Sequence, residues 1–187
     1  EDDVKGFWHL LKAFAMMHRT VPGAKLMIIG EGDFREYRIL AEELGVAEQV
    51  YFTGMQRNPF PYLGAAGLYV LTSYHEGFPN ALVEAMALGI PVIATDCLTG
   101  PREILQSGED IYGVLLPNMS PDKDLDASRI SGEERRLAGE MARMFTDREY
   151  RNRQAAASLE RAGDFSNERY VEQIRRLADG ADEKKAD

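Results

Sequence analysis

Short apolar runs alternate with helical segments along residues 1–120 of this 187-residue chain. The runs are LMIIG (26–30), QVYFTG (49–54), LYVLTS (68–73), IPVIATD (90–96) and YGVLLP (112–117). A run without an alternating polar face suits a strand that is buried on both faces, as in a parallel sheet. Strands that alternate with helices at this pitch predict an open, doubly wound α/β fold with a parallel, Rossmann-like sheet.

The segments between these runs have helical periodicity, because their apolar residues recur at steps of three and four. Gly45 is a predicted C-cap, and Gly89 stands just past the end of a helix that has a proline in its first turn. The helices expected up to residue 120 cover about 4–19, 34–45, 60–66, 79–89 and 101–105.

From Pro121 onward the pattern is helical only. Helices are expected over 131–147, 148–163 and 165–180, each with its own start and stop signals. We therefore expect a core at 1–120, C-terminal helices at 121–180 that pack on the same domain, and a disordered tail at 181–187.

Composition excludes several classes of protein. The formal net charge of −9 and a pI near 4.9 argue against a general nucleic-acid binder, although a local basic pocket for phosphates stays open. Cys97 is the single cysteine, which excludes an internal disulfide framework and fits a reducing compartment. No stretch approaches the roughly 20 apolar residues of a membrane span. The chain opens with EDDVKG, without an initiator methionine or a signal-peptide pattern, and we interpret it as a piece of a longer protein.

Ligands of open α/β sheets bind outside the carboxyl ends of the strands. The segments GEGD (30–33), TGMQRN (53–58), TSYHEGFPN (72–80) and ATDCLTGPRE (94–103) leave strands at that rim. The third is the most informative, because a helix start presents unpaired N–H groups and a partial positive charge to an anion. Pro79 stiffens the turn and leaves the amides of Asn80 and Ala81 available.

Glu76 and Glu84 flank this helix start. Glu84 follows Asn80 by one turn, or roughly 6 Å at 1.5 Å per residue, which resembles the step from a pyrophosphate to ribose hydroxyls. Glu76 then lies near whatever is attached beyond the phosphate. A simpler interpretation is that Glu84 is solvated and that Glu76 only favours the helix dipole. The EGFPN loop and the otherwise apolar helix favour the ligand site.

EGFPNALVEAMALGIPVIATD (76–96) resembles the E-x7-E signature of retaining GT-B glycosyltransferases of the family-4 type. LMIIGEGDFRE, VYFTGMQRNPFPYLGAAGLYVLTS and the opening DVKGFWHLLKAFA are similar to the nucleotide-binding half of that family. The resemblance covers roughly residues 1–180. It is specific for the family and much weaker for the substrate.

The resemblance implies a role for each matching residue. Glu76 would contact the transferred sugar, Glu84 the ribose hydroxyls, and Lys5 would neutralise the diphosphate. The sugar and diphosphate would be held by Gly77, Phe78, Pro79, Asn80 and the amide of Ala81. The arginine that family members carry shortly upstream of this lysine is absent from the chain. The residues GFPN stand where the commoner sequence of this loop in the family begins with Gly-Leu. This variant resembles enzymes whose donors are UDP-linked hexoses or N-acetylhexosamines.

Other rim residues are weaker candidates. Gly30 and Gly32 resemble a dinucleotide fingerprint, but Arg35 replaces its third glycine, so a tight turn flanking the donor is expected. By family analogy Met55, Gln56 and Arg57 lie against the base; a plain polar loop is an equal alternative. Two further expectations are that Gly100 helps to close the pocket and that Arg102 meets phosphate or solvent. His75 is expected to line the site and Cys97 to be a small packing residue.

The resemblance implies one half of a metal-independent enzyme that needs no cofactor. This half would take a nucleotide-sugar donor, and a glycan or lipid-linked acceptor would bind an N-terminal domain outside this chain. We expect the full-length enzyme to act in bacterial cell-surface polysaccharide synthesis and to be located in the cytoplasm. We also expect it to associate peripherally with the inner face of the membrane. The fragment alone is expected to be inactive. The alternatives are a non-catalytic nucleotide-binding module and a GT-B sugar-nucleotide epimerase.

Overall fold

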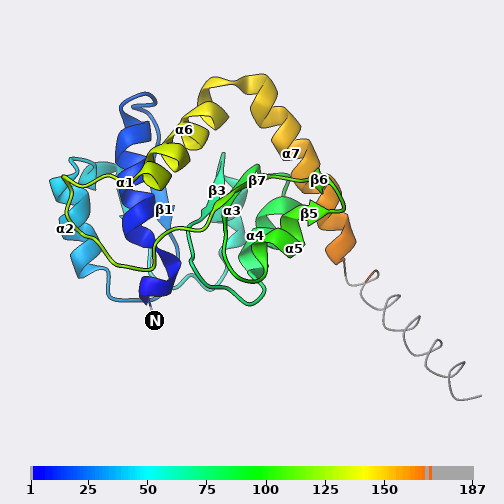
Figure 1. Cartoon of the computed structure of the whole chain (residues 1–187), viewed down its shortest axis with the longest axis horizontal. Coiled ribbons are helices and arrows are strands. Elements are labelled where there is room, and N and C mark those ends of the chain that lie inside the picture. Colours follow the sequence, from blue (N-terminus) through cyan, green and yellow to red (C-terminus); the bar gives the residue numbers. More distant parts are fainter. Residues whose placement is uncertain (1, 167–168, 170–187) are drawn as a thin grey trace, which may run out of the picture.

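The computed structural model describes residues 2–166 and residue 169 (Figure 1). In the amino-terminal part, the elements are the 3-10 helix η1 (Asp2–Lys5), α1 (Phe7–His18), β1 (Leu26–Ile28), α2 (Arg35–Glu43), the 3-10 helix η2 (Ala47–Gln49) and β2 (Val50–Phe52). They continue with α3 (Phe60–Gly64), β3 (Tyr69–Leu71), α4 (Asn80–Ala87), β4 (Val92–Asp96), α5 (Pro101–Leu105), β5 (Gln106–Ser107), β6 (Asp110–Ile111) and β7 (Val114–Pro117). The last are α6 (Gly132–Thr146), α7 (Arg148–Ala162) and the 3-10 helix η3 (Gly163–Phe165).

The strands expected from the apolar runs form parallel sheets, which confirms the α/β fold class. β1 pairs with β2, and β3, β4 and β7 form a second group in that order. Within the part of the chain that the structure describes, no strand pairing joins the two groups. The short antiparallel hairpin of β5 and β6 was not expected, because its residues carry no apolar run.

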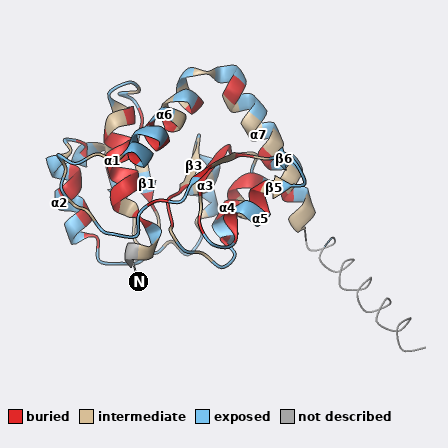
Figure 2. Cartoon of the chain, viewed as in Figure 1, coloured by how far each residue is buried: buried red, intermediate tan, exposed pale blue. Residues whose placement is uncertain are grey.

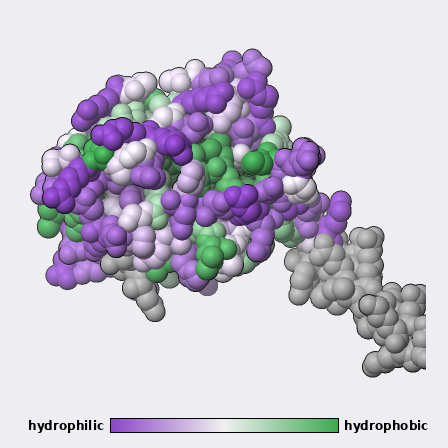
Figure 3. Space-filling model, viewed as in Figure 1, coloured by the Kyte–Doolittle hydropathy of each residue, from purple (hydrophilic) through white to green (hydrophobic). Residues whose placement is uncertain are grey.

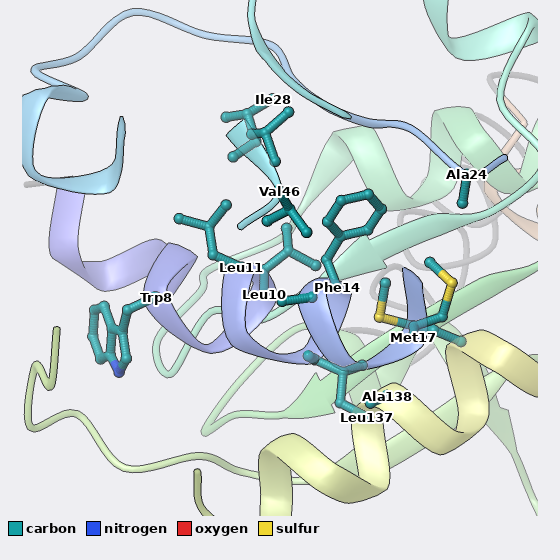
Figure 4. Packing of buried hydrophobic residues seen from close by; sticks show 14 of the residues in the cluster. Trp8, Leu10, Leu11, Phe14, Met17, Ala24, Ile28, Val46, Leu137 and Ala138 are labelled. Carbon is teal, nitrogen blue, oxygen red and sulfur yellow. The ribbon is translucent and has the colours of Figure 1, made fainter. Parts of the chain in front are cut away.

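α1 contributes to a buried cluster that contains residues of both groups of strands, so it joins them into one core. Its side chains Leu11 and Phe14 pack with Ile28 of β1, and Ile93 of β4 belongs to the same buried cluster (Figures 2 and 4). On its other side α1 meets Leu137 of α6 (Figure 4). A second cluster contains Leu82, Met86, Val92, Ile104 and Leu105, and it holds α4 and α5 against β4. Hydrophilic residues dominate the surface of the face in Figure 3, with apolar residues gathered mainly near its middle.

The helix expected over 4–19 is interrupted at Gly6. Gly6 adopts a positive φ of 61°, and a Cβ there would lie 2.5 Å from the carbonyl oxygen of Thr72. The chain therefore turns between η1 and α1, and it comes into direct contact with the segment after β3. Gly45 and Gly89 have φ values of 72° and 68°, so both end their helices as predicted.

The carboxyl-terminal helices α6 and α7 lie close to their predicted bounds. Ser131 and Glu134 form a reciprocal capping box at the start of α6, and Asp147 caps α7. α6 packs against α1, and α7 packs against α4 (Figure 1). Nearly all of the helix expected over 165–180, and the tail 181–187, fall outside the described residues.

The contact between α1 and α6 predicts that Leu137→Ala destabilises the fold. Leu137 is 1% exposed, and removing its side chain leaves a cavity that costs about 2–5 kcal/mol. Urea unfolding followed by circular dichroism measures this change. Leu159→Ala is the matched control, because Leu159 is 55% exposed on α7. Equal losses from the two substitutions would contradict this account of the core.

Candidate functional site

The segment after β3 is held against the start of the chain by two hydrogen bonds. The hydroxyl of Thr72 donates to the carbonyl of Lys5 at 2.8 Å, and the amide of Tyr74 donates to the carbonyl of Val4 at 3.1 Å. These bonds bring η1 to the carboxyl end of β3. Lys5 and Glu76 are thereby placed together although they are far apart in sequence.

Glu76 is the polar centre of this rim. Its Oε1 accepts hydrogen bonds from Lys5 Nζ at 2.7 Å and from Ser73 Oγ at 2.6 Å. The Glu76 side chain is 10% exposed, whereas that of Lys5 is 47% exposed. The carboxylate is therefore fixed in place, while the ammonium group remains accessible from solvent.

The third and fourth rim segments touch each other through Gly100. This residue has a φ of 88°, and a Cβ there would lie 2.6 Å from the carbonyl oxygen of Gly77 and 2.7 Å from Cδ of Pro79. The hydroxyl of Thr99 also donates to the carbonyl of Glu76. The loop before α5 therefore supports the loop before α4 directly.

α4 begins at this supported loop. Its N-cap residue, Pro79, makes no side-chain cap hydrogen bond, and Asn80 and Ala81 are both exposed there. Glu84 is half-buried on the same helix, beside the buried Ala85 and Met86. A short helix with an uncapped, exposed start thus meets the rim a few residues after Glu76.

The charges of Glu76 and Glu84 both affect the pKa of the Tyr69 phenol. Burial raises the pKa of Tyr69 on β3, and the negative charges of Glu76 and Glu84 raise it further. Burial also raises the pKa of the Cys97 thiol, again with a contribution from Glu76. Cys97 is 3% exposed and its thiol faces the carbonyl of Thr99 at 3.6 Å, which fits a packing residue and disfavours a reactive thiolate.

The first two rim segments also meet. The amide of Gly30, where φ is 150°, donates to the carbonyl of Gly54 at 3.1 Å. Gln56 turns its side-chain amide back onto the carbonyl of Thr53 at 2.8 Å. Three other candidates of these segments are exposed, namely Gly32, Met55 and Arg57.

Arg102 has protein partners of its own. Its guanidinium pairs with the carboxylate of Asp96, with one contact of 3.0 Å, and it donates to Gln106 Oε1 at 2.9 Å. His75 and Phe78 are exposed in the third segment.

Sequence reasoning missed several polar residues at this rim, namely Ser73, Asp96, Thr99 and Asn118. Asn118, which follows β7, donates to the carbonyl of Tyr74 at 3.3 Å and so joins the end of β7 to this loop. Their positions at or within three residues of strand ends were the available signal. Among the described residues, no cluster of histidine, cysteine, aspartate and glutamate has the arrangement of a metal site. The described helices also include none that is long and apolar enough to cross a membrane.

A parallel α/β fold with an uncapped helix start and a lysine–glutamate pair at the carboxyl rim belongs to the class of Rossmann-like ligand-binding folds. The family model described as "Glycosyl transferases group 1" matches residues 1–128. The chain therefore belongs to the group 1 glycosyltransferase family, and the resemblance read from the sequence is confirmed.

Curated relatives agree with this family. An uncharacterised glycosyltransferase of Methanocaldococcus jannaschii is 37% identical over 94% of this chain and 47% of its own length. A lipopolysaccharide 1,6-galactosyltransferase of Salmonella typhimurium is 38% identical over 51% of this chain and 28% of its own length. The chain thus spans at most about half of the length of these relatives.

Solved structures share the fold. The pneumococcal O-GlcNAc transferase GtfA, in complex with UDP and GlcNAc, superposes with a TM-score of 0.77 at 20% identity, over 96% of this chain and 34% of the other. The Anabaena protein HepE, in complex with UDP and glucose, gives a TM-score of 0.73 at 24% identity over 95% and 45%. The chain matches less than half of each of these GT-B structures.

The close approach at Gly100 predicts that Gly100→Ala disturbs the loop before α4. An alanine there adopts a φ of 88° and collides with the backbone of Gly77, so stability falls by more than about 1 kcal/mol. Urea unfolding gives this loss, and backbone amide chemical shifts locate it at 77–82. Gly64→Ala is the control, because a Cβ at Gly64 meets nothing within 4 Å. Unchanged shifts at 77–82 in the Gly100 variant would contradict the proposed support.

Proposed function

We propose that this chain is the nucleotide-sugar-binding half of a retaining glycosyltransferase that transfers a hexose or N-acetylhexosamine from a UDP-sugar. The observation that carries the proposal is the Lys5–Glu76 pair, held at 2.7 Å beside the start of α4. Family membership supports it, because the motif around Glu76 and Glu84 resembles the donor-site signature of this family.

The donor diphosphate is proposed to lie between Lys5 and the first turn of α4. Lys5 supplies a positive charge that is half-exposed, and Asn80 and Ala81 supply amides at a helix start whose N-cap residue makes no side-chain cap hydrogen bond. A helix start attracts anions through such amides and through the macrodipole. Lys5 pairs with the carboxylate of Glu76 before the donor binds, and it can pair with the diphosphate when the donor is bound. Its positive charge therefore has a negatively charged partner in both states.

Glu84 is proposed to accept hydrogen bonds from the ribose hydroxyls. It lies four residues, or roughly 6 Å along the axis, beyond Asn80. A carboxylate suits a vicinal diol because it offers two acceptor oxygens. The base would then lie toward the segment of Met55, Gln56 and Arg57, with Gly30 and Gly32 flanking the donor.

Glu76 is proposed to orient the transferred sugar through its hydroxyls. Ser73 and Lys5 donate to the same oxygen of its carboxyl group, which fixes the group before the sugar arrives. In the reaction the bond from the anomeric carbon to the diphosphate oxygen breaks, and the acceptor oxygen bonds to that carbon from the same face. The proton of the acceptor hydroxyl passes to the departing diphosphate. Lys5 and the helix amides stabilise the charge that develops on the leaving diphosphate.

The choice of UDP is supported by the solved structures of similar fold, two of which were determined with UDP and a sugar. Relatives named for lipopolysaccharide synthesis support a role in cell-surface polysaccharide synthesis. We propose that a glycan or lipid-linked acceptor binds a further domain, and that the full-length enzyme works in the cytoplasm at the inner face of the membrane, without a metal ion.

The proposal predicts that the chain binds UDP and that Glu84→Ala weakens this binding about tenfold or more, since a hydrogen bond to a charged group contributes about 1.5–3 kcal/mol. Isothermal titration calorimetry with UDP, GDP and ADP measures affinity and base preference. Glu43→Ala is the control, because Glu43 is an exposed glutamate on α2.

Two outcomes would count against the proposal. If the parent chain binds no nucleotide, the proposed donor site is wrong. If the UDP affinity of Glu84→Ala is unchanged, the proposed contact of Glu84 with the ribose is wrong. We expect no sugar transfer by this chain alone.

A further inference from the structure

Arg161 on α7 binds the carboxyl end of α5 through its guanidinium group. Nε donates to the carbonyl of Ile104 at 2.8 Å, and Nη2 donates to the carbonyls of Glu103 and Gln106 at 2.9 and 3.2 Å. Nη1 pairs with Asp164 at 2.9 Å, and the side chain is 11% exposed. Carbonyls at a helix end lack partners within the helix, so Arg161 supplies the cap of α5.

The other end of α5 lies against the proposed diphosphate loop. α5 begins at Pro101, directly after Gly100, whose backbone leaves no room for a Cβ beside Gly77 and Pro79. α5 is only five residues long. A displacement of its carboxyl end is therefore transmitted to Gly100 and to the loop that Gly100 supports.

A second contact runs through aromatic rings. The Arg161 guanidinium lies 4.8 Å from the ring centroid of Phe165. Phe165 in turn meets Phe78 edge to face, with 5.9 Å between ring centroids. Phe78 stands in the same loop, between Gly77 and Pro79. The loop is thus supported by Arg161 along two routes, one through α5 and one through Phe165.

We infer that Arg161 is a positioning residue that orders residues 77–80, and that through this loop it sets the affinity for the donor diphosphate. This inference rests on the proposed function for its consequence in binding, but not for its consequence in loop order. Arginine is required because its planar fork serves three carbonyls and the face of Phe165 together. Lysine retains the charge but offers neither the fork nor the stacking surface.

The matched substitutions are Arg161→Lys and Arg153→Lys in the full chain. Arg153 lies on the same helix, is exposed and pairs with Glu149 one turn away at 2.6 Å. Backbone ¹⁵N relaxation of the ligand-free protein reports the order of the loop. In the parent we expect order parameters of about 0.85 at Gly77, Phe78 and Asn80, which fall to about 0.6 in Arg161→Lys and are unchanged in Arg153→Lys.

The binding consequence is measured by titration with UDP. We expect affinity to fall about fivefold or more in both Arg161→Lys and Phe165→Leu, with less than additive loss in the double variant because the two residues act on one loop. Phe165→Leu keeps an apolar side chain, so it tests the ring contact without removing the cap of α5.

The two kinds of failure are distinguishable. Loss of UDP binding in the parent chain would refute the proposed function, while the relaxation data would still judge the role of Arg161. An ordered loop in Arg161→Lys, or a uniform loss of order along the whole chain, would overturn the positioning role. Strictly additive losses of affinity in the double variant would overturn the ring route through Phe165.

Discussion

The organisation of this rim depends on the contact between η1 and the segment after β3. The absence of a side chain at Gly6 allows the backbone to approach the carbonyl of Thr72, and the hydrogen bonds of Thr72 and Tyr74 then hold η1 in place. Lys5 reaches Glu76 only because of this contact. A side chain at Gly6 would separate α1 from β3 and would disturb the core and the site together.

A buried polar network also holds α1, on the side where it meets α6. His9, in the first turn of α1, contacts Glu134 at 2.8 Å and the carbonyl of Ser120 at 3.0 Å. Glu134 also completes the capping box of α6 through the amide of Ser131. Because a carbonyl only accepts, the Nε2 of His9 carries a proton. The imidazole of His9 thereby joins α1 to the start of α6 and to the segment after β7.

The rim is therefore supported from both ends of the chain. α1 and η1 hold Lys5 and the residues up to Glu76, while Arg161 of α7 and Phe165 of η3 hold the residues that follow. Within the GFPN loop, Gly77 and Phe78 are exposed, Pro79 is buried, and the ring of Phe78 meets Phe165. Its order is supplied by neighbours, through the hydrogen bond and the close approach at the loop before α5 and through the ring of Phe165.

The sequence by itself determined the parallel strands, most of the helices and the family, because hydrophobic periodicity and the glycines at positions 45 and 89 are local properties that act within a few residues. The β5–β6 hairpin and the break between η1 and α1 were not predicted. It also identified Glu76, Glu84 and Lys5 as candidates through their motif. The tertiary structure alone decided that Ser73 and Lys5 share one oxygen of Glu76, that Arg102 is engaged by Asp96, and that Arg161 supports the loop. These contacts join residues distant in sequence or on different loops, and no local pattern encodes them.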